Sequence, residues 1–74
     1  MAKRETLDDL LAERVPTEGV TEFAERAGVS PRTLFRLRSG IGTRPTRGVL
    51  TLLALALKVA VDRVEAAVEA SRKA

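Results

Sequence analysis

Five arginines, with no acidic residue among them, lie between residues 30 and 48 of this 74-residue chain. A guanidinium group is a permanent cation whose planar set of N–H donors suits carboxylates and phosphates. Residues 1–29 carry four basic and seven acidic side chains, and residues 49–74 carry four and three, so the positive charge is concentrated in one quarter of the chain. This distribution predicts a polyanionic partner, although a solvated basic face without a ligand would have the same charge pattern.

The residue types that usually carry catalysis or bind metals are missing from the sequence. There is no cysteine and no histidine, which excludes disulfides, zinc sites of the Cys/His kind, thiol nucleophiles and imidazole acid–base chemistry. The most concentrated acidic pair, Asp8 and Asp9, is explained by a position at the start of a helix, where carboxylates are stabilising. The sequence therefore predicts a binding module and no enzyme, with no metal, no cofactor and no small-molecule substrate.

The charges of the first residues and the length of the apolar stretches indicate where in the cell the protein is found. Charged side chains are frequent among the first ten residues, where a signal peptide would need an apolar run. The longest weakly charged stretch, residues 48–57, is far shorter than the ~20 residues that span a bilayer. We expect a cytoplasmic protein without a membrane partner.

The apolar residues that must form the core are mostly aliphatic and recur at helical spacing. Only two aromatic residues accompany a hydrophobic content of 45%, which suits helices packed on helices. We predict a charged arm at residues 1–6 and a single domain at residues 7–72. Its first helix begins at Leu7, because Thr6 is a good N-cap and Asp9 follows it three residues later.

Residues 20–27 and 31–39 predict two short helices joined by a tight turn. Gly28 can adopt the left-handed conformation that closes the first helix, while Ser30 and Pro31 suit the N-cap and the first position of the second. Small or apolar residues are expected where the two helices pack on each other: Ala24, Val29, Leu34 and Leu37. The pattern is typical of a helix-turn-helix.

Two more helices are expected in the second half of the chain. Residues 49–57 follow an N-cap signal at residues 45–46 and are apolar on nearly every side, which predicts a helix buried at the centre of the bundle. The last helix has an apolar stripe of Val61, Val64 and Val68, and we expect it to fray from Ser71 onward. At the junction of the two helices, Lys58 and Ala60 are compatible both with a break and with one continuous helix.

The sequence resembles families of DNA-binding proteins. Residues 28–37 look like the turn and recognition helix of many bacterial helix-turn-helix regulators, including AraC-like and TetR-like ones, with the sequence GVSPRTLFRL. Residues 45–64 are similar to the fourth and fifth helices of the lambda-repressor-like (Cro/XRE) family, so the resemblance covers about residues 7–68. The chain departs from that family at Val20, where a polar residue is usual, and at Lys58 and Ala60, where glycine and serine are usual.

The resemblance implies an all-α, five-helix lambda-repressor-like bundle that contains a helix-turn-helix. It also implies a transcriptional regulator that binds a specific sequence of double-stranded DNA with residues 31–39 in the major groove. At ~100° per residue, one side of this helix carries Ser30, Leu34 and Leu37. The opposite side, which would face DNA, carries Arg32, Phe35, Arg36 and Ser39.

The resemblance also implies which residues contact DNA. Base contacts are expected from the start of the recognition helix and from one turn later: Pro31, Arg32, Thr33, Phe35 and Arg36. Arginine is the usual bidentate donor to guanine, so Arg32 and Arg36 are each expected to read a guanine. For Phe35, packing beneath the loop of residues 41–44 is an equally weighted alternative. The candidate phosphate contacts are Thr21, Arg38, Ser39, Arg44, Thr46 and Arg47.

The sequence leaves alternatives open on partner, arm and origin. A helical protein-interaction or dimerisation module that has lost DNA binding is the alternative function, with residues 49–57 and 61–68 as its seam. A homodimer through these two helices, on a palindromic site, is compatible with either function. Lys3 and Arg4 fit either a minor-groove arm or a disordered tail. The surplus of Ala, Leu, Val and Arg suits either a GC-rich bacterium or a designed or redesigned protein.

Overall fold

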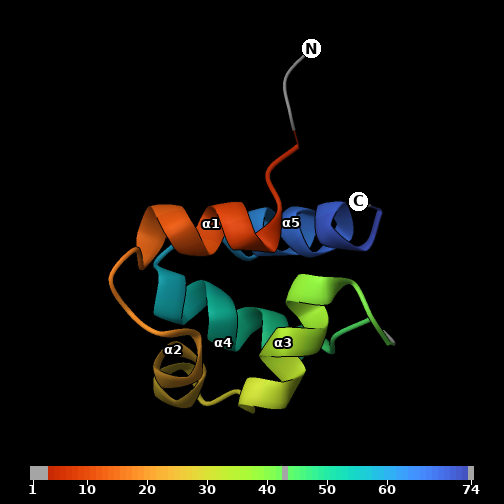
Figure 1. Cartoon of the computed structure of the whole chain (residues 1–74). Helices are drawn as coiled ribbons and strands as arrows, with labels where there is room; N and C mark the ends of the chain where they lie inside the picture. The colour runs from red at the N-terminus through yellow and green to blue at the C-terminus, as the bar shows by residue number, and fades with distance from the viewer. Residues whose placement is uncertain (1–3, 43, 74) are drawn as a thin grey trace.

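The chain forms five helices in a computed structural model that describes residues 4–42 and 44–73. The helices α1 and α5 lie side by side as one layer, and α2, α3 and α4 lie below them in the view of Figure 1. No strand occurs in the described residues, so the expected all-α, five-helix bundle is confirmed. The elements are α1 (Leu7–Arg14), α2 (Val20–Ala27), α3 (Pro31–Ser39), α4 (Arg47–Leu57) and α5 (Val61–Lys73).

The core is aliphatic, as expected, apart from one phenylalanine. All five helices contribute to it, and its largest fully buried side chains are Phe23, Leu7, Leu10, Leu34, Leu53, Leu57, Val64 and Val68. Burial of one such side chain stabilises the fold by about 1.5–3 kcal/mol. No side-chain N or O atom that is buried within the described residues lacks a hydrogen-bond partner.

Local capping and a distant serine together fix the start of α1. The Thr6 hydroxyl accepts a hydrogen bond from the Asp9 amide, and the Asp9 carboxylate accepts one from the Thr6 amide, which confirms the expected capping box. The Leu7 amide donates to Oγ of Ser71 in α5. The prediction that the last helix frays from Ser71 is therefore wrong, because Ser71 is held between α1 and the Ala67 carbonyl, and α5 extends to Lys73.

The turn between α2 and α3 has the expected form. Gly28 has φ +82°, and the amide of Val29 donates to the Ala24 carbonyl, so the turn closes α2 and directs the buried Val29 into the core. Pro31 occupies the first position of α3. Ser30 is the N-cap residue, but its hydroxyl makes no capping hydrogen bond and the residue is exposed, contrary to its expected place on the buried side.

The junction between α4 and α5 is a break. Lys58 adopts a left-handed conformation with φ +60°, and its amide donates to the Leu55 carbonyl. The Val59 amide donates to the Ala54 carbonyl, which completes the closure of α4. The two helices are therefore separate, with a lysine in the role that glycine usually has.

The helix α4 differs from the fully buried central helix that its composition predicted. One side packs into the core through Leu50, Leu53 and Leu57, but Leu52 and Leu55 are exposed. Thr51 is the single polar residue among residues 49–57, which is too few to give a helical periodicity, so the sequence could not show that one side of the helix faces solvent. No described helix is both long enough and apolar enough to span a membrane.

Candidate nucleic-acid interface

The solvent side of α3 presents the residues that sequence analysis assigned to DNA. Leu34 and Leu37 are buried against the rest of the bundle, which fixes the rotation of the helix about its axis. Four residues on the opposite side are exposed, as expected, and form what we call the recognition face: Arg32, Phe35, Arg36 and Ser39. Pro31 and Thr33 are partly buried at its edges.

The two arginines of the recognition face are free to bind. Neither Arg32 nor Arg36 forms an ion pair or a side-chain hydrogen bond with any residue that the structure describes. Their guanidinium groups therefore keep all five N–H donors for an external acceptor. Two unpaired guanidinium groups one turn apart on an exposed helix are suited to hydrogen-bond acceptors on a ligand.

Of the other three arginines in residues 30–48, two form ion pairs within the chain and one does not. Arg38 donates to the carboxylate of Asp8 on α1, and Arg44 lies 3.3 Å from the carboxylate of Glu69 on α5. Arg47, at the first position of α4, is exposed, and its guanidinium has no partner in the described part of the chain. At Arg38 and Arg44, a carboxylate of the same chain competes with an external phosphate.

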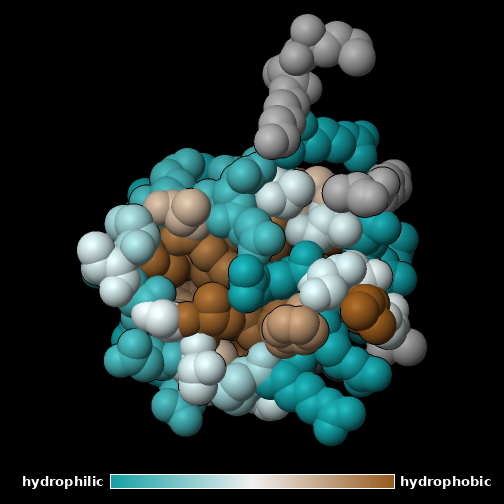
Figure 2. All heavy atoms as spheres, viewed as in Figure 1, coloured by the Kyte–Doolittle hydropathy of each residue, from teal (hydrophilic) through white to brown (hydrophobic). Residues whose placement is uncertain are grey.

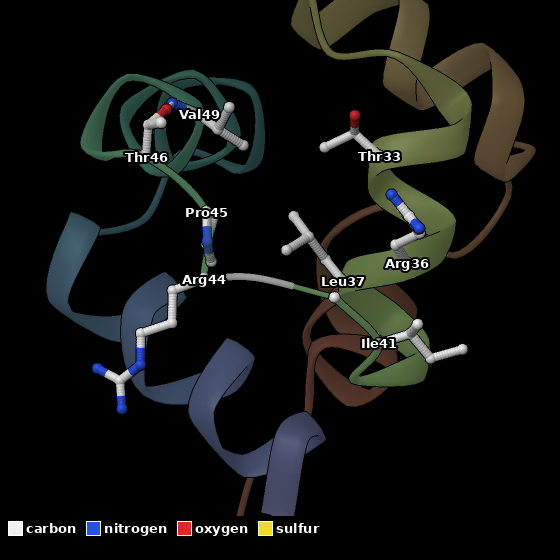
Figure 3. A pocket seen from close by; sticks show the side chains of 9 residues that line it. Thr33, Arg36, Leu37, Ile41, Arg44, Pro45, Thr46 and Val49 are labelled. Carbon is white, nitrogen blue, oxygen red and sulfur yellow. Dashed lines mark hydrogen bonds between the residues drawn. The ribbon is translucent and has the colours of Figure 1, made fainter.

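An open hollow of about 230 Å³ separates α3 from the start of α4. Thr33 and Arg36 lie on its α3 side, Thr46 and Val49 on its α4 side, and Leu37 near its middle in Figure 3. The Arg44 side chain points away from this hollow, in keeping with its ion pair to Glu69. The Thr46 hydroxyl accepts from the Val49 amide and thereby serves as the expected N-cap of α4.

Two large apolar side chains are exposed beside these cations. Phe35 is 60% exposed, which favours a position facing solvent over packing beneath the loop of residues 41–44. Ile41, which sequence analysis did not select, is 54% exposed and lines the hollow together with Arg36. The sequence did offer a signal for Ile41, because this large apolar residue directly follows Gly40, where α3 ends. Figure 2 shows apolar side chains among hydrophilic ones on this face of the molecule.

The start of α2 is less favourable for an anion than expected. Thr21 is exposed there, and the N-cap Gly19 provides no side-chain hydrogen bond. However, a Cβ atom added to Gly19 would lie 2.8 Å from a carboxylate oxygen of Glu22. The Glu22 carboxylate therefore lies over the positive end of α2 and competes with any external anion.

Several carboxylates in the acidic first third of the chain form ion pairs with arginines. Arg63 donates to the carboxylates of Glu5 and Glu13, and these hydrogen bonds raise the pKa of Arg63 and lower the pKa of Glu5. A bidentate pair of Arg26 with Glu18 lowers the pKa of Glu18 in the same way and raises that of Arg26. Of the expected arm, Glu5 is thus attached to α5, Arg4 is exposed, and Lys3 lies outside the described residues.

Comparison with known proteins gives one family. A model of the helix-turn-helix family matches residues 19–64, which extend from the N-cap of α2 into the first turn of α5. The match includes the recognition face and the hollow beside it. No curated protein and no solved structure matches the chain.

Proposed function

The chain belongs to the lambda-repressor-like helix-turn-helix family of DNA-binding domains, and we propose that it binds a specific sequence of double-stranded DNA with α3 in the major groove. In this mode the recognition helix presents its first turns to base edges, and neighbouring elements contact the phosphates. The domain regulates transcription by occupying its site.

The observation that carries the proposal is the unpaired state of Arg32 and Arg36 on the exposed side of α3. An arginine that forms no ion pair within its own chain loses nothing internally when it binds a base. Each guanidinium matches O6 and N7 of guanine, and one such pair discriminates against a wrong base by about 1–3 kcal/mol. Pro31, Thr33 and Phe35 complete the base-contacting set, with Phe35 placed to meet a thymine methyl or a sugar.

The phosphate contacts centre on the hollow between α3 and α4. Thr46 lines the hollow at the N-terminus of α4, where the first amides point out of the helix end. Arg47, the first residue of α4, is exposed and its guanidinium is unpaired within the described residues. Ser39 extends this surface along α3. Arg38, Arg44 and Thr21 are weaker members, because Asp8, Glu69 and Glu22 compete with phosphate at these three positions.

The experiment is a selection from a random DNA library, followed by salt titration of the best site. The variants are Arg32→Ala, Arg36→Ala and Arg47→Ala. The control is Arg26→Ala, which removes the same charge from α2, where Arg26 is paired with Glu18. Arg32→Lys and Arg36→Lys keep the charge but lose the planar fork of donors.

Direct readout requires different responses from these variants. Arg32→Ala and Arg36→Ala should each relax one base position, the lysine variants should keep general affinity but relax the same positions, and Arg47→Ala should weaken all sequences equally. Affinity should fall steeply with salt. If no site is enriched, or if Arg32→Ala and Arg36→Ala weaken every sequence as Arg26→Ala does, the proposal of sequence-specific binding is wrong.

A further inference from the structure

The last turn of α5 packs directly against the turn that closes α3. Gly40 ends α3 with φ +71°, and a Cβ atom added there would lie 2.7 Å from the carbonyl oxygen of Ser71 and 3.0 Å from the Cα atom of Arg72. A side chain at this point would require a shift of the α5 backbone. The end of α5 therefore limits the path that the chain can take as it leaves α3.

Arg72 is attached to the same turn through its side chain. Its Nη1 atom donates a hydrogen bond of 2.8 Å to the carbonyl oxygen of Gly42, a residue 30 positions earlier in the chain. Arg72 forms no ion pair and no other side-chain hydrogen bond with a residue that the structure describes. Two contacts with α5, one at Gly40 and one at Gly42, thus hold the turn in place.

Gly42 in turn lies beside the guanidinium group of Arg36. A Cβ atom added to Gly42 would lie 3.9 Å from the guanidinium carbon and 4.0 Å from Nε of Arg36. The Ile41 amide donates a hydrogen bond of 3.0 Å to the Arg36 carbonyl. Arg36 and Ile41 lie on the same side of the hollow in Figure 3. The turn therefore meets Arg36 both at its backbone and beside its charged end.

We infer that Arg72 is a positioning residue for Arg36, and this inference rests on the DNA binding by α3 proposed above. Arg72 holds Gly42, and Gly42 bounds the space into which the Arg36 guanidinium can turn. A long side chain whose rotamers are restricted before binding loses less conformational entropy when it pairs with a base. Arg72 thereby contributes to the reading of one guanine through the fold, without being part of the recognition face.

The two base-reading arginines should depend on Arg72 to different extents. Arg32 lies in the first turn of α3 and does not line the hollow that contains Gly42. Removal of the Arg72 side chain should therefore affect Arg36 and leave Arg32 as it is. A general stabilising role of Arg72, such as that of a cation near the carboxyl end of α5, would affect both arginines alike.

Side-chain NMR of the free protein tests the ordering directly. The heteronuclear NOE of the Nε–Hε group of Arg36 should fall in Arg72→Ala, while that of Arg32 should stay the same. Arg72→Lys keeps a donor and should preserve most of the NOE. The matched control is Arg14→Ala, which removes one charge and a hydrogen bond of 3.1 Å from Nε to the Leu57 carbonyl, between α1 and the end of α4. An Arg36 NOE that is equal in the parent and in Arg72→Ala would overturn the inference.

Affinity ratios on DNA test the consequence for base reading. In the best site from the library selection, the guanine assigned to each arginine is replaced in turn, and the loss of affinity is measured for each variant. Arg72→Ala should reduce the discrimination at the base read by Arg36 at least about threefold, and leave that at the base read by Arg32 unchanged. Loss of folded protein weakens binding to every sequence by the same factor, so it cancels in these ratios. Equal losses at the two bases, or no loss at either, would overturn the inference.

A double variant shows whether Arg72 acts through Arg36. In the Arg36→Ala background, Arg72→Ala should have no further effect on discrimination at that base, because the side chain that Arg72 positions is absent. A further loss as large as the one in the parent would contradict the proposed route.

These outcomes separate this inference from the proposed function. If the library selection enriches no site, sequence-specific binding is wrong, and the NMR comparison still decides whether Arg72 orders Arg36. If Arg36 reads a guanine and Arg72→Ala leaves that discrimination unchanged, the proposed function stands and this inference alone is wrong.

Discussion

The amide of Leu7 donates a hydrogen bond of 2.9 Å to Oγ of Ser71, a residue 64 positions further along the chain. Leu7 is fully buried, so this amide at the first position of α1 has no access to water. Ser71→Ala should destabilise the domain by about 1–3 kcal/mol, since it leaves a buried donor unsatisfied. Chemical denaturation measures the change, with Ser39→Ala at an exposed position as the control. Equal effects of the two substitutions would show that the bond is unimportant.

Two glycines with similar backbone conformations should respond differently to alanine. Gly28 has φ +82° with open space around it, whereas a Cβ atom at Gly40, with φ +71°, would lie 2.7 Å from the Ser71 carbonyl oxygen. Gly28→Ala should cost roughly 1–2 kcal/mol for the left-handed conformation alone. Gly40→Ala should cost about 1–3 kcal/mol more, because α5 must move away from the end of α3. A smaller loss for Gly40→Ala, measured by thermal unfolding, would show that α3 and α5 are less closely packed than described.

Lys58 is the single non-glycine residue with positive φ within the described residues. Lys58→Gly should stabilise the domain by about 0.5–1 kcal/mol, because the relief of backbone strain exceeds the added entropy of the unfolded chain. Lys58→Ala keeps the strain and serves as the control. Stabilisation by alanine of the same size as by glycine would mean that the lysine side chain, and not its backbone, is unfavourable.

Arg38 forms an ion pair with Asp8, so under the proposed function Asp8 competes with DNA for Arg38. Asp8→Asn should raise the affinity for any duplex by about two- to fivefold, since an exposed ion pair is worth about 0.2–1 kcal/mol. Asp62→Asn removes the same charge from the first turn of α5 and should have a smaller effect. Fluorescence anisotropy with a labelled duplex measures both, and the difference should disappear at high salt. Equal gains from the two variants would show that only net charge matters.

The contact between Glu5 and Arg63 should make stability depend on pH in the acidic range. The pKa of Glu5 is lowered in the folded chain by its hydrogen bonds from Arg63. Its contribution is therefore fully present above the ordinary glutamate pKa of about 4.3 and is lost as the pH falls through the lower folded-state value. In Glu5→Gln, the free energy of unfolding should no longer show this loss at acidic pH. Glu65→Gln, which removes a carboxylate without an ion pair in the described residues, should retain it.

Features that depend on neighbouring residues were predictable from the sequence. The capping box of Thr6 and Asp9, the left-handed turn at Gly28 and the rotation of α3 set by Leu34 and Leu37 all lie within one or two helical turns of their signals. The exposure of Arg32 and Arg36 followed directly from that rotation, because it fixes which side of α3 faces solvent.

Features that depend on residues far apart in the chain were not predictable. The ion pairs of Arg38 with Asp8 and of Arg44 with Glu69 span 30 and 25 positions, and no local pattern shows that these arginines have internal partners. The same holds for Ser71, which a terminal position suggested was frayed. The exposure of Leu55 depends on how α2 and α5 pack against α4, and a run with Thr51 as its single polar residue contains little information on that packing.

The contact between Leu7 and Ser71 brings the beginning and the end of the folded domain together. A short linker could therefore join the two ends, and new ends could be opened at another surface loop, without a change in the position of α3. Domains whose ends meet tolerate such circular permutation and insertion into other proteins. The same recognition helix could then be placed within a host chain at a defined orientation, attached at two points instead of one.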